Sequence, residues 1–344
     1  MQGFTRKLTF AGVLALAFAA VPASAQTPEQ YYRNRQVTML IASGVGGGYD
    51  AYARAFARHI GRHIPGNPTI VPRNVPGAGG LAGTSMLYNN SARDGSVFAA
   101  LTNGIAMDPL FGTSANRFDA MRLNWLGSIG KLESICVTWH ESPIRSIEQA
   151  RTQEIVVGSA GATSNTGMMP RVVNEFIGTR FRVVGGYTEG TGTTLALENG
   201  EIQGICGISY TTLKAARPTW FRDNQLNVIL QIGLRKLPDL PGVPNLLDLM
   251  TDEEDKRVLE LILVRQEMGR PFAMPPETPA GRVAALRRAF DATVRDPAFL
   301  AEAARLQLEV DPLTGAEIET LLRAAYAAPR PIVERAARLV GPLN

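Results

Sequence analysis

The chain has 344 residues, with 35 Lys and Arg against 31 Asp and Glu, and a formal net charge of +4. Removing Arg6 and Lys7 lowers this charge by two, to +2, and no stretch concentrates the other basic residues, which excludes nucleic acids and anionic membranes as expected partners. A chain of this length normally forms two domains.

The first 25 residues have the three parts of a secretory signal. Arg6 and Lys7 precede an apolar run at residues 8–20, and Ala23 and Ala25 fit the small-residue pattern of a cleavage site. The apolar run is too short to span a bilayer, and the residue directly after the expected cleavage site is Gln26, not a cysteine that could accept a lipid. We therefore expect cleavage after Ala25 and a soluble mature protein in the periplasm.

The stretch 37–64 predicts a strand, a glycine loop and a helix. Residues 37–42 are an apolar, β-capable run, residues 43–48 are rich in glycine, and residues 51–58 favour a helix. The first N–H groups of such a helix have no intrahelical partner, and the helix dipole favours an anion beside them. We expect this loop to form half of a carboxylate-binding site.

Two alternatives for the glycine loop remain open. Gly44 and Gly46 match the first two glycines of a dinucleotide fingerprint, but Tyr49 stands where the third small residue is needed. The next strand, residues 69–73, ends without the acidic residue that would bind a ribose. The other alternative is a tight turn without a ligand.

Strands and helices alternate up to residue 101, which predicts a parallel sheet. A strand at 69–71, a turn at 76–80 and a helix to Asn90 lead to a strand at 96–101. This strand ends at Thr102-Asn103-Gly104. Open α/β sheets bind ligands at the carboxyl ends of their strands, so we expect this second loop to face the first.

The middle of the chain repeats this plan after an extended crossing at residues 125–139. A strand, a loop of small and hydroxylated residues, a helix and two further strands are expected at 155–157, 158–167, 168–177, 181–184 and 202–208. The loop has more polar side chains than turn formation needs, which favours ligand binding. These side chains belong to Ser159, Thr163, Ser164, Asn165 and Thr166.

A second crossing at 227–233 leads into a mostly helical C-terminal part with one strand at 268–275. Capping boxes are predicted at Thr251 with Glu254 and at Thr314 with Glu317. We expect an α/β protein of two lobes, each a mostly parallel sheet flanked by helices, with the ligand cleft between them. Lobe 1 is predicted at residues 26–129 plus 234–344, and lobe 2 at residues 130–233.

Cys136 and Cys206 are the two cysteines of the chain, and both lie in short apolar runs of the expected second lobe. An oxidising compartment allows two cysteines to pair. Free cysteine also packs well as a small apolar residue. A disulfide and two buried thiols therefore both remain open.

Metal and nucleophile chemistry find little support. His59 and His63 are four residues apart, but no Glu lies between them and His140 is the only other histidine, so we expect a solvated helix face and no metal. No Gly-x-Ser-x-Gly elbow is present. Asp50 is either the N-cap of the first helix or a direct ligand contact. We expect neither an enzyme nor a cofactor.

Together these motifs resemble the Bug family, the TctC-like extracytoplasmic substrate-binding receptors of tripartite tricarboxylate transporters. The resemblance covers essentially the whole chain after the signal. It rests on Gly-Gly-Gly-Tyr-Asp at 46–50, Arg-Asn-Val-Pro-Gly-Ala-Gly-Gly at 73–80, Asp-Gly at 94–95, Gly-Ser-Ala-Gly at 158–161 and Gly-Gly-Tyr-Thr-Glu-Gly-Thr at 185–191.

The resemblance implies a type II-like, two-lobed periplasmic binding protein that closes on a small organic acid. It implies that loop N–H groups, hydroxyls and bridging water hold the acid, without arginine. Its partners would be the permease subunits of the transporter or a sensor kinase, and the protein would be a monomer. The ligand-binding residues implied by position are Gly44, Gly46, Gly47, Gly48, Tyr49, Asp50, Thr102, Asn103, Ser159, Thr163, Ser164, Asn165, Tyr187, Glu189 and Ser209.

Two positions depart from the family pattern. Most members have a proline near Ser43, and many have a lysine where Glu189 stands. A carboxylate beside the cleft argues against a ligand with three negative charges. The alternative from another class is a secreted enzyme that uses Asp50 or Glu189 as an acid or base on a small carboxylate.

Overall fold

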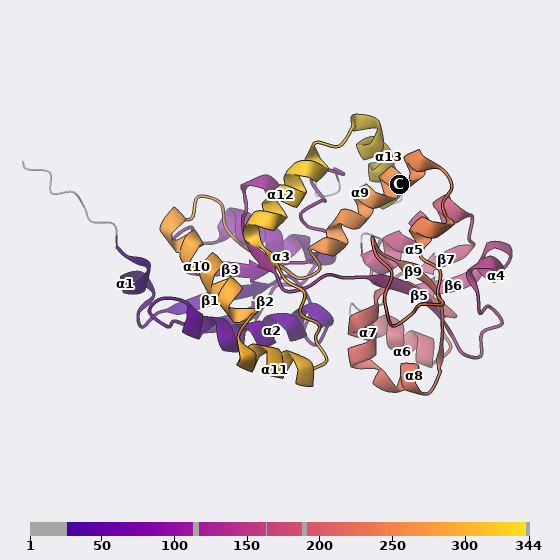
Figure 1. Cartoon of the computed structure of the whole chain (residues 1–344), viewed down its shortest axis with the longest axis horizontal. Coiled ribbons are helices and arrows are strands. Elements are labelled where there is room, and N and C mark those ends of the chain that lie inside the picture. The colour runs from indigo at the N-terminus through magenta and orange to yellow at the C-terminus, as the bar shows by residue number, and fades with distance from the viewer. Residues whose placement is uncertain (1–25, 113–116, 163, 188–190, 342–344) are drawn as a thin grey trace, which may run out of the picture.

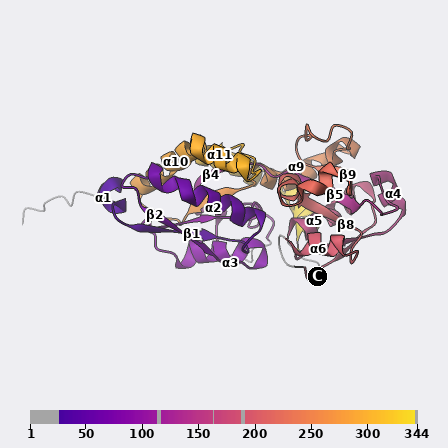
Figure 2. The same cartoon turned by 90° about the horizontal axis from the view of Figure 1, so that it is seen from below.

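A computed structural model describes residues 26–112, 117–162, 164–187 and 191–341. The predicted signal sequence, residues 1–25, lies outside these ranges. Two lobes lie side by side along the longest axis of the molecule, each built on its own sheet (Figures 1 and 2). Within the described ranges, no helix combines the length and the apolar character needed to cross a bilayer.

The strands are β1 Gln36–Ile41, β2 Thr69–Asn74, β3 Val97–Ala100, β4 Asn124–Ser128, β5 Ser134–Trp139, β6 Ile155–Gly158, β7 Phe181–Val184, β8 Gly204–Ser209, β9 Leu226–Ile232, β10 Pro271–Met274 and β11 Leu313–Thr314. The helices are α1 Pro28–Tyr32, α2 Gly48–Ile60, α3 Leu81–Ser85, α4 Ile147–Thr152, α5 Asn165–Ile177, α6 Gly192–Glu198, α7 Tyr210–Ala216, α8 Pro218–Arg222, α9 Glu253–Glu267, α10 Ala280–Thr293, α11 Pro297–Arg305, α12 Gly315–Tyr326 and α13 Arg330–Val340. Short 3-10 or π turns are η1 Gly61–His63, η2 Ala78–Gly80, η3 Met86–Asn90, η4 Ala120–Arg122 and η5 Leu246–Leu249.

The first sheet has the strand order β11-β4-β10-β3-β1-β2. Its strand β1 pairs in parallel with β2 and β3 and is buried along most of its length. Helix α2 covers the sheet through Phe56, whose ring centroid lies 4.6 Å from that of Phe272 and 5.1 Å from that of Phe290. This packing holds the start of α2 beside the carboxyl end of β1, as the strand, loop and helix pattern predicted.

The second sheet has the strand order β7-β6-β8-β5-β9. Strand β6 is parallel to β7 and β8, and α5 follows β6 as α2 follows β1. The inner face of α5 buries Met168, Met169, Val172 and Val173 completely or nearly so. The predicted repetition of the strand, loop and helix plan in the second lobe is therefore confirmed.

Both sheets are mixed, whereas the prediction was mostly parallel sheets. β10 runs antiparallel to β3 and β4, and β5 runs antiparallel to β8 and β9. β5 and β10 are the strands by which the chain enters each lobe from the connections between the lobes. β5 and β10 therefore start at the cleft and run away from it, whereas the strands antiparallel to them end at the loops of the cleft.

Residues 234–250, which the predicted division put in lobe 1, hydrogen-bond to the second sheet. The side-chain amide of Gln231 on β9 donates to the carbonyls of Leu240 and Val243, at 2.7 and 2.8 Å. Asp239 forms an ion pair with Lys214 of α7 at 2.6 Å. The division into lobes stays a prediction, and these contacts favour moving its second limit to about residue 250.

Two C-terminal helices pack together on the second lobe. α13 contacts α9 and α5, and Arg335 of α13 pairs with Asp255 of α9. Arg171 of α5 donates from Nη1 to the Gly341 carbonyl at 2.8 Å. In Figure 1, α9 runs through the region where the two lobes meet. The C-terminal part of the chain therefore contacts both lobes.

One of the two predicted capping boxes is confirmed. Thr314 and Glu317 form the reciprocal bonds of a capping box at the start of α12. At α9 the N-cap is Asp252, one residue after the predicted Thr251, and its side chain accepts a hydrogen bond from the Asp255 N–H. Asp caps a helix at least as well as Thr, so the helix starts at the later residue.

Cys136 on β5 and Cys206 on β8 form a disulfide. The two residues are direct register partners in the second sheet. The sequence left a disulfide and two free thiols open because it did not fix which strands are neighbours. The pairing of β5 with β8 decides for the disulfide.

Candidate functional site

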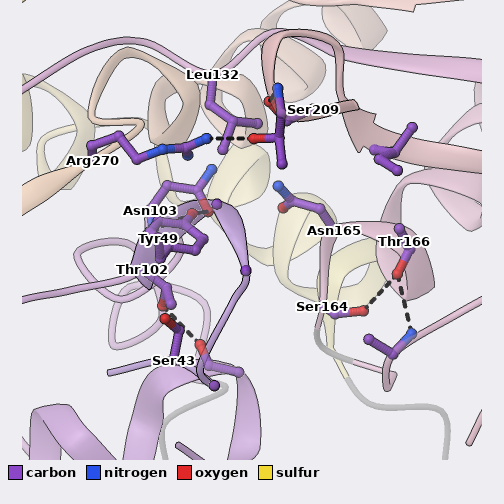
Figure 3. A pocket seen from close by; sticks show the side chains of 18 of the residues that line it. Ser43, Tyr49, Thr102, Asn103, Leu132, Ser164, Asn165, Thr166, Ser209 and Arg270 are labelled. Atoms are coloured by element: carbon purple, nitrogen blue, oxygen red, sulfur yellow. Dashed lines mark hydrogen bonds between the residues drawn. The ribbon is translucent and has the colours of Figure 1, made fainter. Parts of the chain in front are cut away.

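A cleft between the lobes brings together the loops that the sequence singled out. Its cavity volume is about 150 Å³. An engineered cavity of this volume binds benzene, so the cleft suits a small molecule. Figure 3 shows Tyr49 and Asn103 on one side and Ser164 and Asn165 on the other. The predicted residues that line the cleft are Gly44, Gly47, Gly48, Tyr49, Thr102, Asn103, Ser164, Asn165 and Ser209.

The glycine loop between β1 and α2 forms part of the first wall. Gly47 is the N-cap of α2 and makes no side-chain cap bond to the helix. A Cβ on Gly48 would lie 2.8 Å from Oγ1 of Thr212, which belongs to α7 of the other lobe. Only glycine therefore allows this close approach of the two lobes.

Tyr49 and Asn103 join the two predicted loops of the first lobe. The Tyr49 hydroxyl donates to Asn103 Oδ1 at 3.0 Å and accepts from the Asn103 N–H at 3.1 Å. Asn103 is buried, and its Nδ2 has no hydrogen-bond partner. Beside it, Thr102 donates to the Gly79 carbonyl at 2.7 Å. The Asn103 amide is therefore held in place with its donor group unused.

The second wall is the start of α5. Ser164 is the N-cap, and its side chain accepts a hydrogen bond from the Gly167 N–H. Thr166 accepts from the Ala160 N–H at 3.2 Å, which ties the loop to the helix. Asn165 has a buried Oδ1 that no described residue pairs by a hydrogen bond. This wall uses more of its polar groups internally than the first wall does.

The starts of two long helices meet at this cleft. α2 and α5 have 13 residues each, and residues of the first turn of both line the cavity. Helix starts carry partial positive charge and free N–H donors. An anion between them would be stabilised by both, which fits the predicted carboxylate site.

Two arginines line the cleft, although the family resemblance implied recognition without arginine. Arg265 lies in the last turn of α9, and Arg270 directly precedes β10. Both are more than nine-tenths buried. Arg265 could have been suspected from sequence, because it continues the buried stripe of α9 through Val258 and Ile262.

Arg270 reaches across the cleft. Its Nη2 donates to Thr212 Oγ1 in the other lobe at 2.9 Å, a bond drawn in Figure 3. Its guanidinium carbon lies 4.6 Å from the ring centroid of Tyr49 and 4.8 Å from that of Tyr52. Burial raises the pKa of Tyr52, so this ring stays neutral. The two rings orient the cation toward the second lobe.

Four predicted residues do not line the cleft: Gly46, Asp50, Ser159 and Tyr187. Asp50 is not the N-cap, which is Gly47; it lies in the first turn of α2. Its carboxylate accepts from the Gly46 N–H at 2.9 Å, from Arg54 Nε at 2.8 Å and from Asn74 Nδ2 at 2.9 Å. Asp50 therefore braces the glycine loop from behind.

Ser159 likewise stays within its own loop, where it accepts from the Gly161 N–H at 3.0 Å. Two further predicted residues, Thr163 and Glu189, lie outside the described residues. Thr166, which the sequence singled out among the polar side chains of the second loop, also lines the cleft. The other lining residues were not predicted; they are Ser43, Gly79, Leu132, Ala160, Thr193, Gly207, Ile208, Thr212, Arg265 and Arg270.

His59 and His63 bind acidic side chains of α11. His59 Nε2 lies 2.5 Å from Glu302, and His63 Nε2 lies 2.6 Å from Asp296. The prediction of a solvated helix face is wrong for His59, which is buried under α11. Hydrogen bonds from Arg58 and His59 lower the pKa of Glu302 to about 2. In the part of the chain that the structure describes, no group of His, Cys, Asp and Glu is arranged to hold a metal.

No known family's model matches the chain. A UPF0065 protein of Bordetella bronchiseptica is 25% identical over 185 residues, which are 52% of this chain and 53% of that protein. The match thus spans about half the length of this curated relative.

Solved structures match the fold over most of the chain. The periplasmic binding protein BugD is 20% identical, with a TM-score of 0.67 over 90% of this chain and 97% of that one. A Rhodopseudomonas palustris protein solved with adipate is 17% identical, with a TM-score of 0.69 over 90% and 99%. MatC of Rhodopseudomonas palustris, with bound malate, is 18% identical, with a TM-score of 0.65 over 89% and 99%. The predicted resemblance is confirmed, and this chain has the two-lobed fold of the Bug-type periplasmic binding proteins.

Proposed function

We propose that this chain is a periplasmic solute-binding protein that captures a small organic acid. It delivers the acid to a membrane permease of the tripartite tricarboxylate type or reports it to a sensor kinase. In this proposal residues 1–25 are a signal sequence cleaved after Ala25, and the mature protein is a monomer. The lining residues of the interlobe cleft are its ligand contacts.

One observation carries the proposal. The cleft lies between the starts of α2 and α5, and buried polar atoms of Asn103 and Asn165 have no hydrogen-bond partner among the described residues. Buried polar groups are nearly always paired in folded proteins. The carboxylate of a small acid would accept a hydrogen bond from Asn103 Nδ2, and a donor group of the ligand, such as a hydroxyl, would pair Asn165 Oδ1. The negative charge would also be stabilised by both helix dipoles.

The fold relatives support the same class of ligand. Structures of this fold have been solved with adipate and with malate, both small carboxylates. The cavity of about 150 Å³ suits molecules of this size. The exact acid is set by the side chains of the cleft and differs between proteins of one fold.

The enzyme alternative has less support. It assigned acid or base chemistry to Asp50 or Glu189. Asp50 accepts three hydrogen bonds, from Gly46, Arg54 and Asn74, and does not line the cleft. A carboxylate that is fully bonded inside the fold has no free geometry for proton transfer to a ligand.

Calorimetry on the purified mature protein tests the proposal. Titration with a panel of small carboxylates that includes adipate and malate should give one-to-one binding of at least one acid. The acid recovered from the complex should have an unchanged mass, because a receptor returns its ligand. Turnover of the acid would favour the enzyme alternative, and binding of none of the panel would reject the proposal for these acids.

Closure of the lobes has its own measurement. We expect one hinge at residues 128–131, between β4 and β5. The sequence suggested a second hinge at 231–234, but residues 234–250 stay with the second sheet, so we expect it between α9 and β10, at residues 268–270. Small-angle scattering should show a smaller radius of gyration when ligand is added. A bound ligand that leaves the scattering curve unchanged would contradict closure at these hinges.

A further inference from the structure

Arg265 is a buried cation without an acidic partner in the described part of the chain. It is 5% exposed. Its Nη1 contacts the Met168 sulfur at 3.4 Å, its guanidinium packs against Gly104, and its Nε has no hydrogen-bond partner. A thioether is a weak acceptor, so it offsets little of the cost of burying a full charge.

Arg270 is in a similar position. It is 3% exposed, and its Nε also lacks a partner. Its remaining bonds go to neutral oxygens, the Gly269 carbonyl at 2.9 Å and Thr212 Oγ1 at 2.9 Å. The faces of Tyr49 and Tyr52 stabilise the cation in part. No carboxylate of the described residues pairs with it.

Unpaired buried atoms concentrate at the cleft. Eight buried side-chain nitrogen and oxygen atoms of the described residues have no hydrogen-bond partner, and one of them, Asp255 Oδ1, forms an ion pair with Arg335. Of the other seven, five belong to residues that line the cleft. Four of these five belong to groups that can donate a hydrogen bond, which suits an acceptor such as a carboxylate. The atoms are Ser43 Oγ, Asn103 Nδ2, Asn165 Oδ1, Arg265 Nε and Arg270 Nε.

The charge around the cleft is one-sided. Its described lining includes two arginines, the starts of α2 and α5, and no Asp or Glu. Two buried positive charges without counterions among the described residues are unfavourable in the empty protein. Each would be compensated by one negative charge of a ligand at hydrogen-bond distance.

We propose that Arg265 and Arg270 make the cleft selective for the number of negative charges on its ligand, so that it takes a small dianion in preference to a monoanion. The inference rests on the proposed function. It adds the number of negative charges that the ligand carries and the two residues that recognise them. Arg270 has a second role, because its hydrogen bond to Thr212 also connects the two lobes.

The test compares dicarboxylates with their own monoamides, which have nearly the same size and one charge less. Succinate and adipate are the dianion probes, and calorimetry at pH 7.5 measures affinity. The wild-type protein should bind the better dicarboxylate at least tenfold more tightly than its monoamide. Arg265→Met and Arg270→Gln should each lower this ratio to about twofold.

Arg287→Gln is the matched control. This arginine is partly buried and bonded to the Trp125 carbonyl and to Glu319, away from the cleft. It should keep the wild-type ratio. Equal affinity of wild type for a diacid and its monoamide would overturn the inference. So would variants at Arg265 and Arg270 that weaken both compounds by the same factor.

Thermal unfolding of the empty proteins separates failure of the inference from failure of the proposed function. Methionine has nearly the length of arginine and no charge, so Arg265→Met should unfold at the wild-type temperature or above it. If none of the probes binds, the proposed function fails for these acids. The unfolding temperatures of the empty wild type and Arg265→Met then still test whether the buried charge of Arg265 is unfavourable without a ligand. A lower unfolding temperature for Arg265→Met would then show that Arg265 is structural and would overturn the inference.

Discussion

The two walls of the cleft are built on one plan but differ in how they treat their own N–H groups. In the first lobe, the N-cap of α2 is Gly47, which has no side chain that could cap the helix. In the second lobe, Ser164 caps α5 with its own hydroxyl. The comparison indicates that the first wall is the more open donor surface and that the second wall contributes mainly through Asn165.

The largest expected difference between the lobes is in stability. The disulfide of Cys136 and Cys206 closes a loop of 70 residues in the second lobe, and the chain has no other cysteine. Replacing both by serine should lower the free energy of unfolding by about 2–4 kcal/mol. Urea unfolding measures this loss, and hydrogen exchange should quicken in β5 and β8 before it does in β1.

The disulfide itself is checked by mass. Under non-reducing conditions the intact protein should be lighter than the reduced chain by two hydrogens. Full alkylation of two thiols after denaturation without reductant would contradict the pairing.

Contact between the two walls is the next largest effect. Gly48→Val places a Cβ 2.8 Å from Thr212 Oγ1, so the walls cannot approach as they do now. We expect a loss of ligand affinity of about 100-fold, or ~2.7 kcal/mol. Calorimetry gives the loss, and scattering should show less compaction on adding ligand.

The control for this change is Gly281→Ala in α10, where an added Cβ meets nothing within 4 Å. It should leave affinity unchanged and should slightly stabilise the helix, because alanine has the higher helix propensity. Wild-type affinity of Gly48→Val would remove the α2 wall from the site.

Replacing Asn103 or Asn165 compares the contributions of the two walls to ligand affinity. Asn103 and Asn165 stand on opposite walls, each with one unpaired buried atom. Asn103→Ala should weaken binding of a carboxylate by about tenfold, since Asn103 Nδ2 can donate to it and a hydrogen bond to a charged group contributes about 1.5–3 kcal/mol. Asn165→Ala should have a smaller effect, because the unpaired Oδ1 of Asn165 accepts and can only pair a neutral donor of the ligand. Asn103→Ala should cost more, because Asn103 also bonds to the Tyr49 hydroxyl. Calorimetry that ranks Asn165→Ala as the worse variant would reverse our assignment of the walls.

The smallest expected effect on affinity is that of Asp50→Asn. An asparagine side chain has one acceptor oxygen, and its NH2 group replaces the other. In one of its two orientations the NH2 group faces the Gly46 N–H, so that hydrogen bond is lost. The free energy of unfolding should therefore fall by about 1–3 kcal/mol. Affinity should stay within about twofold, since Asp50 does not line the cleft. Denaturant unfolding and calorimetry check the two expectations. A loss of affinity of tenfold or more would show that Asp50 contacts the ligand.

The sequence by itself determined the local elements of this protein. The apolar run of β1, the glycines that follow it and the start of α2 were all visible, and so were the hydroxylated loop before α5 and the Thr314 cap. Each of these depends on hydrogen bonds and side-chain periodicity within a few residues. Such patterns are local properties of a chain, and they survive whatever the rest of the fold does.

Tertiary structure decided which segments meet. Arg265 and Arg270 lie more than 200 residues after the glycine loop. The apolar stripe of α9 could indicate that Arg265 is buried, but not that either arginine meets the glycine loop at a cleft. Asp50 belongs to the predicted glycine loop, but its side chain bonds to Arg54 and Asn74 behind the loop, because of its position on the turn of α2. The pairing of Cys136 with Cys206 followed from β5 lying beside β8. These outcomes depend on packing between distant segments, which local sequence patterns do not encode.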